Sequence, residues 1–349
     1  MNATDFNPNG VGIDNGNYFG MPFSEQEAQL VLISVPWDVT SSYGSGSSNA
    51  PDTIIEASTQ LDFYDIAAPD AWRKGIATAG IDYSIQDRSA RYRADAKKVI
   101  QLLESGNTLY DNIMQFCLNR VNKGSAELNE EVYNQVKELL AQGKLVGLVG
   151  GDHSTPYGAI KAVAEHEQNI GLLHFDAHCD LRCAYEGFIH SHASIMYNVM
   201  ESIPQVAKLV QVGIRDCCDD EIAYAAANDK VEIFADHTLA ANRFEGMTWK
   251  QQCDMIVEKL PQKVYISFDI DGLSPENCPS TGTPVPGGLS FNEAVYLMKH
   301  VVDSGRRIVG FDMCEVVPHR KTQWDANVGA RVLYKLCGQI LRSNPDEEK

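Results

Sequence analysis

Short apolar runs alternate with longer segments of helical periodicity from residue 30 onward. Six runs rich in β-branched residues predict strands: Leu30–Val35, Val146–Val149, Ile170–Phe175, Leu209–Val212, Val264–Phe268 and Arg307–Phe311. Five segments between or after them predict helices: Glu127–Gln142, Thr155–His166, Trp249–Leu260, Phe291–Val302 and Asp325–Leu341. Several strands are apolar on both faces, which is typical of a covered parallel sheet. The pattern predicts an α/β fold with three layers, a mostly parallel sheet covered by helices on both faces.

The same pattern predicts one domain, residues 29–349, preceded by an N-terminal extension, residues 1–28. The extension is rich in Asn and Gly, and no linker or internal repeat interrupts the rest of the chain. The first residues carry neither a basic flank nor an apolar stretch, so we expect no secretory signal and a cytoplasmic protein. No apolar run approaches the roughly 18 residues of a membrane span, so no membrane partner is expected.

The composition of the chain limits which classes of partner the protein can bind. The 349 residues include 29 Lys+Arg and 47 Asp+Glu, a formal net charge of −18. Phosphate contacts need clustered cations, so this balance excludes a nucleic-acid partner and leaves small neutral or cationic molecules. The nine cysteines contain no CxxC pair, which argues against a disulfide framework or a structural zinc site.

Four short segments concentrate Asp, His and Glu directly after predicted strands. They are Gly150–Ser154, Asp176–Asp180, Asp269–Asp271 and Phe311–Glu315. In an open α/β sheet the carboxyl ends of parallel strands form one rim, where ligands bind. Segments far apart in sequence are therefore expected to converge. Spacing by two in extended backbone would also put the ionisable residues of the second and third segments on one face.

These residues predict a metal centre. Carboxylates crowded at the end of an apolar strand bundle repel one another unless cations compensate them. Two His and four Asp are too many ligands for one tetrahedral zinc, and suit two divalent ions that share carboxylates: His153, Asp176, His178, Asp180, Asp269 and Asp271. Oxygen ligands with some imidazole favour two Mn²⁺ per chain, with Ni²⁺ or Zn²⁺ as alternatives. The competing interpretation is an acidic protein that scatters Asp over its surface.

The segments GGDHS, DAHCD and SFDIDGLSPENCPSTGTPVPGGLS resemble the three signature blocks of the ureohydrolases, the arginase and agmatinase family. The loop from Val35 to Pro51 resembles the first strand-loop segment of that family, so the resemblance runs from about residue 30 to the end. It implies an arginase-like fold, a binuclear manganese centre formed by the six ligands, and hydrolysis of a linear amidine. It also implies a homotrimer or a homohexamer.

The expected catalytic residues are Asp180, His192 and Glu315. Glu315 follows a strand, where it can pair with a guanidinium, and matches the family's substrate-orienting glutamate. A proton shuttle needs a histidine near the rim, and His192 resembles the family's His-Gly-Thr stretch better than His190 does. His190 is a candidate for substrate binding or for the shuttle itself, and the alternative for either histidine is a solvated loop position.

The substrate class stays open at this point. Arg182, just after Asp180, suggests that the substrate carries an anionic tail, and Asp-Leu-Arg resembles formimidoylglutamase, which releases formamide. The stretch Thr281–Gly288 instead resembles enzymes of guanidino compounds, which release urea and an amine. Cys218 stands where arginase has an aspartate, which disfavours arginine itself. We expect a small guanidino substrate such as agmatine, a guanidino acid or a smaller guanidine. Alternatives are formimidoylglutamase, a single-zinc deacetylase of the same fold, and a catalytically inactive relative.

Overall fold

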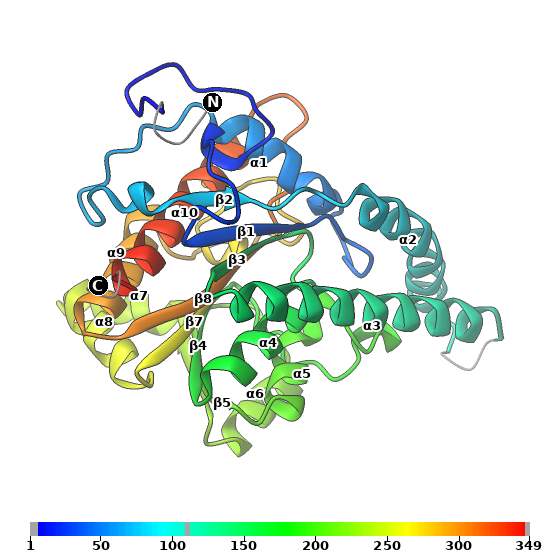
Figure 1. The fold of residues 1–349 in the computed structure, drawn as a ribbon. Coiled ribbons are helices and arrows are strands. Elements are labelled where there is room, and N and C mark those ends of the chain that lie inside the picture. The colour runs from blue at the N-terminus through cyan, green and yellow to red at the C-terminus, as the bar shows by residue number, and fades with distance from the viewer. Residues whose placement is uncertain (1–5, 109–111, 346–349) are drawn as a thin grey trace.

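The computed structural model describes residues 6–108 and 112–345, and its centre is one parallel β-sheet (Figure 1). All neighbouring strands pair in parallel, in the order β2-β1-β3-β8-β7-β4-β5-β6. The strands are β1 Leu30–Val35, β2 Ile76–Thr78, β3 Leu145–Gly150, β4 Ile170–Phe175, β5 Val206–Ile214, β6 Val231–Ala235, β7 Lys263–Asp269 and β8 Arg307–Cys314. The predicted parallel sheet is confirmed.

Helices cover both faces of this sheet (Figure 1). The core cluster on one face includes side chains of α1 Ala50–Ser58, α7 Asp236–Phe244, α8 Trp249–Glu258, α9 Phe291–Asp303 and α10 Trp324–Ser343. The cluster on the other face includes side chains of α2 Tyr83–Glu104, α3 Asn112–Ala141, α4 Tyr157–Glu167 and α5 Ile195–Ser202, with α6 Asp219–Ala227 beside them. The predicted three-layer arrangement is confirmed.

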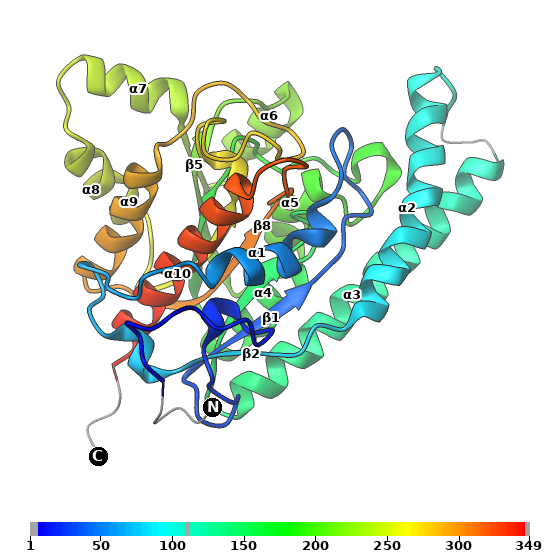
Figure 2. The ribbon, with the colours of Figure 1, turned by 90° about the horizontal axis from the view of Figure 1, so that it is seen from above.

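The predicted elements are all present, but the pattern missed others. β2 has only three residues, and β6 is an edge strand whose last four residues are half-buried, so neither carries a strong apolar signal. Helix α2 buries Ser89, Arg93 and Asp95 along with its apolar side chains, which interrupts its apolar stripe. Helix α3 begins well before the predicted segment and, with α2, reaches beyond the sheet (Figure 2). No helix of the described residues is long and apolar enough to cross a membrane.

The N-terminal segment is packed against the body through a few large side chains. Tyr18, Phe19 and Met21 are buried. The Tyr18 hydroxyl lies 2.8 Å from Ser34 Oγ on β1, and the Phe19 ring lies 5.2 Å from that of Tyr334 on α10. These contacts join the segment to the core cluster that α1 and α10 share.

The centre of the sheet determines where the polar residues meet. Strands β3, β8, β7 and β4 are consecutive neighbours, and each of the four polar segments begins at the carboxyl end of one of them. Parallel pairing brings those ends to one rim. Residues as far apart in the sequence as His153 and Glu315 therefore lie within hydrogen-bond distance of each other.

Candidate metal centre

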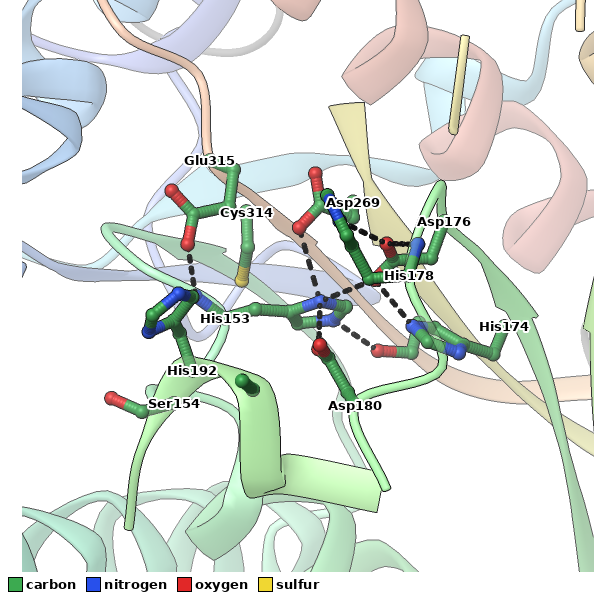
Figure 3. A network of polar contacts seen from close by, with 12 residues as sticks. His153, Ser154, His174, Asp176, His178, Asp180, His192, Asp269, Cys314 and Glu315 are labelled. Carbon is green, nitrogen blue, oxygen red and sulfur yellow. Dashed lines mark hydrogen bonds and ion pairs between the residues drawn. The ribbon is translucent and has the colours of Figure 1, made fainter. Parts of the chain in front are cut away.

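The first part of the site is a buried cluster around His153 (Figure 3). His153 Nδ1 lies 3.1 Å from Asp176 Oδ2, 3.4 Å from Asp180 Oδ2 and 3.2 Å from Asp269 Oδ2. Three carboxylates from two strands thus point at one imidazole nitrogen. This geometry is that of ligands converging on a common point.

A second group lies beside the first and shares a carboxylate with it. His178 Nδ1 is 3.3 Å from Asp176 Oδ1 and 3.1 Å from Asp271 Oδ2. Asp176 therefore faces His153 with one oxygen and His178 with the other. A carboxylate shared in this way can lie between two neighbouring cations, and the two groups together contain all six predicted ligands.

The backbone reason that we gave for this convergence is wrong, although the side chains do meet. Strand β4 ends at Phe175, and Asp180 has a left-handed φ of 55°, so the second segment is not extended. Asp269 Oδ1 accepts the N–H of Asp271 at 2.9 Å and caps a 3-10 turn, Ile270–Gly272. Local turns, rather than strand alternation, aim these carboxylates.

Gly272 shows how closely the two segments approach each other. A Cβ on this residue would lie 2.7 Å from the backbone nitrogen of Asp176, closer than real Cβ contacts. Any side chain there would push the segment carrying Asp269 and Asp271 away from the one carrying Asp176. Glycine after the third ligand pair is thus required by packing.

Buried partners orient the two histidines beneath the cluster. His153 Nε2 lies 2.8 Å from Ser267 Oγ, which in turn donates to Asp312 Oδ1 at 3.0 Å. Because the Ser267 hydroxyl donates its proton to Asp312, it can only accept from His153. Nε2 of His153 therefore carries the ring proton, and Nδ1 keeps a lone pair that can bind a metal ion. His174 is fully buried and has both ring nitrogens within hydrogen-bond distance of a partner, Gln211 on one side and Asp176 on the other.

The electrostatics favour cations at this rim. Burial, followed by the charges of Asp271 and Asp176, raises the pKa of Asp269 well above its usual range. Burial and Asp176 likewise raise the pKa of Asp180 to about 6. Burial opposes the charged form of His178, but Asp271 and Asp176 outweigh it and raise the pKa of His178 to about 12. The cluster thus binds protons in place of other cations, and the donor set fits divalent ions.

A cavity of about 180 Å³ opens above the cluster. Its lining consists of Ser42, His153, His178, Asp180, Arg182, Tyr185, His192, Ala193, Asp216, Glu221, Asp269, Thr283 and Glu315. Glu315 follows β8 with a left-handed φ of 63°, and its Oε1 accepts the N–H of His153 at 2.9 Å. Burial and then Asp152 raise the pKa of Glu315 well above its usual range, so a cationic partner would favour its ionised form.

The two candidate shuttle histidines lie in different places. His192 lines the cavity, and its Nε2 lies 3.3 Å from Ser42 Oγ. Burial, with the charges of His178 and Arg93, lowers the pKa of His192 to about 3. His190 does not line the cavity, and its ring packs 5.5 Å from that of Tyr157 on α4. The structure therefore brings His192 to the site and leaves His190 outside it.

Arg182 lines the cavity but is already paired. Its Nε lies 3.6 Å from Glu221 Oε2, and its guanidinium lies 4.8 Å from the centre of the Tyr185 ring. Glu221 is buried and also accepts the backbone N–H groups of Leu181 and Cys218. A fixed acid thus compensates the charge that suggested an anionic substrate tail.

Sequence reasoning missed several residues of the site. Thr283 donates to Asp271 Oδ2 at 3.3 Å, and Asp152 accepts from Thr40 and Ser154, which ties the loop after β1 to the one after β3. Ser267 could have been found from the sequence, because it lies two residues before Asp269 and therefore on the same face of the strand. Ser42, Tyr185, Asp216 and Glu221 had no such signal, because they reach the cavity from loops or a helix start.

Comparison with known proteins agrees with this geometry. The model of the arginase family matches residues 28–338. The chain is 32% identical over 317 residues to the N(1)-aminopropylagmatine ureohydrolase of Thermus thermophilus, covering 90% of each. It is 29% identical over 304 residues to the agmatinase of Cronobacter sakazakii, covering 85% of this chain and 82% of that one. The chain belongs to the arginase family, so the predicted class, a hydrolase of the ureohydrolase type, is confirmed.

Solved structures share the fold. The proclavaminate amidino hydrolase from Streptomyces clavuligerus superimposes with a TM-score of 0.72 at 24% identity, over 96% of this chain and all of that one (100%). At this level of identity the likeness concerns the architecture. It confirms the arginase-like sheet that the sequence predicted.

Proposed function

We propose that this protein hydrolyses a guanidino compound other than arginine to urea and an amine, using two divalent ions. The observation that carries the proposal is the shared carboxylate: Asp176 faces His153 and His178 with different oxygens, next to a cavity lined by Glu315. Six ligands in two groups that share one carboxylate are too many for one tetrahedral ion and suit two. The relatives named above act on guanidino compounds, which favours this reaction over formimidoylglutamase chemistry.

The six predicted ligands would hold the ions, and we propose Mn²⁺ because four carboxylates and two imidazoles form an oxygen-rich donor set. When bound, two such ions supply a water molecule made acidic enough to act as a nucleophile near neutral pH. A site with complete ligands on both sides disfavours the single-zinc deacetylase and the inactive relative. The predicted trimer or hexamer and the cytoplasmic location stay predictions.

Glu315 would position the substrate. Its Oε1 is held by the N–H of His153, and a Cβ on Gly282 would lie 3.5 Å from its Oε2, so a small residue leaves that oxygen open. An ionised carboxylate at this point can accept two N–H groups of a guanidinium in parallel. This would present the planar guanidinium carbon to the buried Asp and His cluster.

His192 would move the proton that the leaving amine needs. Its imidazole lines the cavity, and its Nε2 lies 3.3 Å from Ser42 Oγ, so the ring is within reach of the groups that would react there. Asp180, also in the cavity lining, would take part as a ligand next to the reacting atoms. We do not extend this role to His190, since it packs on α4.

The test is urea release together with metal content. Purified protein, loaded with Mn²⁺, is assayed on agmatine, guanidinobutyrate, arginine and formiminoglutamate, and its metal is measured by elemental analysis. We expect about two ions per chain, urea from at least one guanidino compound, and little turnover of arginine. One tightly bound zinc per chain, or formamide as the only product, would refute the proposal.

A further inference from the structure

Two cysteines that the proposed function leaves unused lie beside the metal centre. Cys179 stands between the predicted ligands His178 and Asp180 in the sequence, and its side chain is fully buried. Cys217 follows Asp216, which lines the substrate cavity, and is exposed. Both are free thiols. One thiol of this pair is therefore shielded from solvent, and the other is open to a small reagent.

Backbone pairing brings the two cysteines side by side. The N–H of Asp216 donates to Ala177 O at 3.0 Å, and Asp216 pairs with His178 in a parallel β-bridge. The next residue of each segment is a cysteine, Cys179 and Cys217, and their thiols make a side-chain hydrogen bond to each other. Paired strands lie about 4.8 Å apart, and a disulfide joins Cα atoms about 4.4–6.8 Å apart. The spacing of the two segments therefore suits a disulfide.

A bond between these sulfurs would change the substrate cavity. Gln211 on β5 donates to Cys179 O at 2.7 Å, which fixes the backbone of the buried partner. A disulfide holds its sulfurs about 2.0 Å apart, much closer than a hydrogen bond does, so one segment must shift when the bond closes. Both segments contribute to the cavity lining, through His178 on one and Asp216 on the other. The cavity therefore changes whichever segment moves.

The two neighbouring cysteines have other partners. Cys218 begins α6 in a capping box with Glu221, whose Oε2 accepts the Cys218 N–H at 3.0 Å. Cys183 is exposed, and its thiol is hydrogen-bonded to the hydroxyl of Tyr197. The structure thus favours Cys179 as the partner of Cys217.

We propose that Cys179 and Cys217 form a reversible disulfide when the protein meets hydrogen peroxide, and that this bond lowers turnover. The Cys217 sulfur attacks one peroxide oxygen and becomes a sulfenic acid, while the O–O bond breaks and the other oxygen leaves as water with the thiol proton. The Cys179 sulfur then attacks the Cys217 sulfur, and the hydroxyl leaves as a second water with the Cys179 proton. Two thiols thus give two electrons to one peroxide.

The surroundings of Cys217 favour an uncharged oxidant. Asp216 and Asp219, on either side of the two adjacent cysteines, are both exposed acids. They repel an anionic disulfide reagent but have little effect on hydrogen peroxide, which is small and neutral.

Disulfide mapping tests the pair without any substrate. The Mn²⁺-loaded protein is treated with hydrogen peroxide, the remaining thiols are alkylated, and its peptides are compared by mass spectrometry with and without dithiothreitol. We expect a cross-link between Cys179 and Cys217, with the loss of two hydrogens, that disappears on reduction. A bond between Cys217 and Cys218, or sulfinic or sulfonic acid as the only product at Cys217, would overturn the proposal.

Turnover of a guanidine that the protein cleaves measures the consequence. We expect peroxide to lower kcat/KM of the wild type about tenfold or more, because small displacements of reacting groups are costly, and dithiothreitol to restore it. Cys217→Ser should match the untreated wild type and keep its activity in peroxide, since Cys217 does not line the cavity. Cys183→Ser, the matched control, also removes an exposed thiol but should lose activity as the wild type does.

Two results would overturn the effect on turnover: equal sensitivity of Cys217→Ser and the wild type to peroxide, or a mapped disulfide with unchanged kcat/KM. If no guanidine of the panel gives urea, the proposed function fails, while the mapping still confirms or overturns the disulfide.

Discussion

The floor of the substrate cavity and its outer wall are built in opposite ways. The floor consists of side chains that follow four central strands, and its Asp176, Asp269 and His153 are almost completely buried. The wall around Tyr185 belongs to a loop in which Ala184 and Glu186 have left-handed φ values of 49° and 56°. The floor is held by the sheet, whereas the wall is a loop held by backbone and side-chain hydrogen bonds and by the buried Phe188. If the proposed function holds, we expect the reaction chemistry to depend mainly on the floor and the fit of the substrate tail to depend also on the wall.

The strongest test of the floor removes a charged ligand. Asp271→Asn should lower kcat by about three orders of magnitude. Several kcal/mol of transition-state stabilisation would come from the two metal ions, and these need the negative charge of Asp271 to neutralise them. Elemental analysis should find fewer than two ions per chain, and chelation of the wild type should abolish urea release until Mn²⁺ is restored.

The control for this variant is Asp325→Asn. Asp325 is also a buried acid, but its Oδ1 accepts the N–H of Ser280 instead of facing the cluster. It should keep both ions. Near wild-type turnover and full metal occupancy in Asp271→Asn would show that Asp271 is not a ligand.

The second test concerns the boundary between floor and wall. His192→Ala should lower kcat about 10²–10³-fold with little change in KM, since a proton shuttle acts in the chemical steps. His190→Ala should have a much smaller effect, because His190 packs on Tyr157 outside the cavity. Steady-state kinetics with the reverse ranking would assign the shuttle to His190.

The third test asks whether the buried hydrogen bonds beneath the floor tune the metal. Ser267→Ala leaves His153 Nε2 without its 2.8 Å partner, so the affinity for Mn²⁺ should fall about 10- to 100-fold. Metal titration followed by occupancy measurement reads this directly. Ser58→Ala removes another fully buried serine hydroxyl, which accepts the N–H of Phe19 instead of contacting the cluster, and should lower stability alone. Equal metal affinities in the two variants would contradict the role of Ser267.

The smallest effect is expected in the wall. Asn122 on α3 makes two hydrogen bonds to the loop that forms the wall. Its Nδ2 donates to Gly187 O at 3.1 Å, and its Oδ1 accepts the N–H of Ile189 at 2.8 Å. Asn122→Ala should raise KM about three- to tenfold and change kcat little, since each lost hydrogen bond contributes about 1 kcal/mol.

Asn122→Asp keeps the acceptor for Ile189 but turns a carboxylate oxygen toward the Gly187 carbonyl oxygen, so it should not restore the wild-type KM. Asn134→Ala, an exposed position on the same helix, is the control and should leave KM unchanged. A loss of kcat without a rise in KM for Asn122→Ala would show that the loop supports the floor as well.

The sequence by itself determined the layers of the fold and the six ligand candidates. Apolar runs such as Ile170–Phe175 are buried on both faces, so their pattern alone required a covered parallel sheet. Parallel strands then bring their carboxyl ends to one rim, which is why His153, Asp176 and Asp269 could be grouped without a structure. These conclusions depend on two properties. The periodicity of apolar residues is local in the sequence, and the meeting of strand ends at one rim holds for nearly all parallel sheets.

Only the tertiary structure decided how the ligands are aimed and what stands around them. The left-handed turn at Asp180 and the capped turn at Asp269 replace the extended backbone that the spacing suggested. Glu221 lies far from Arg182 in sequence, yet it compensates the charge from which an anionic tail was inferred. The sequence gives the charge of each residue. Whether that charge can contact a substrate depends on partner residues that only folding brings within a few ångströms.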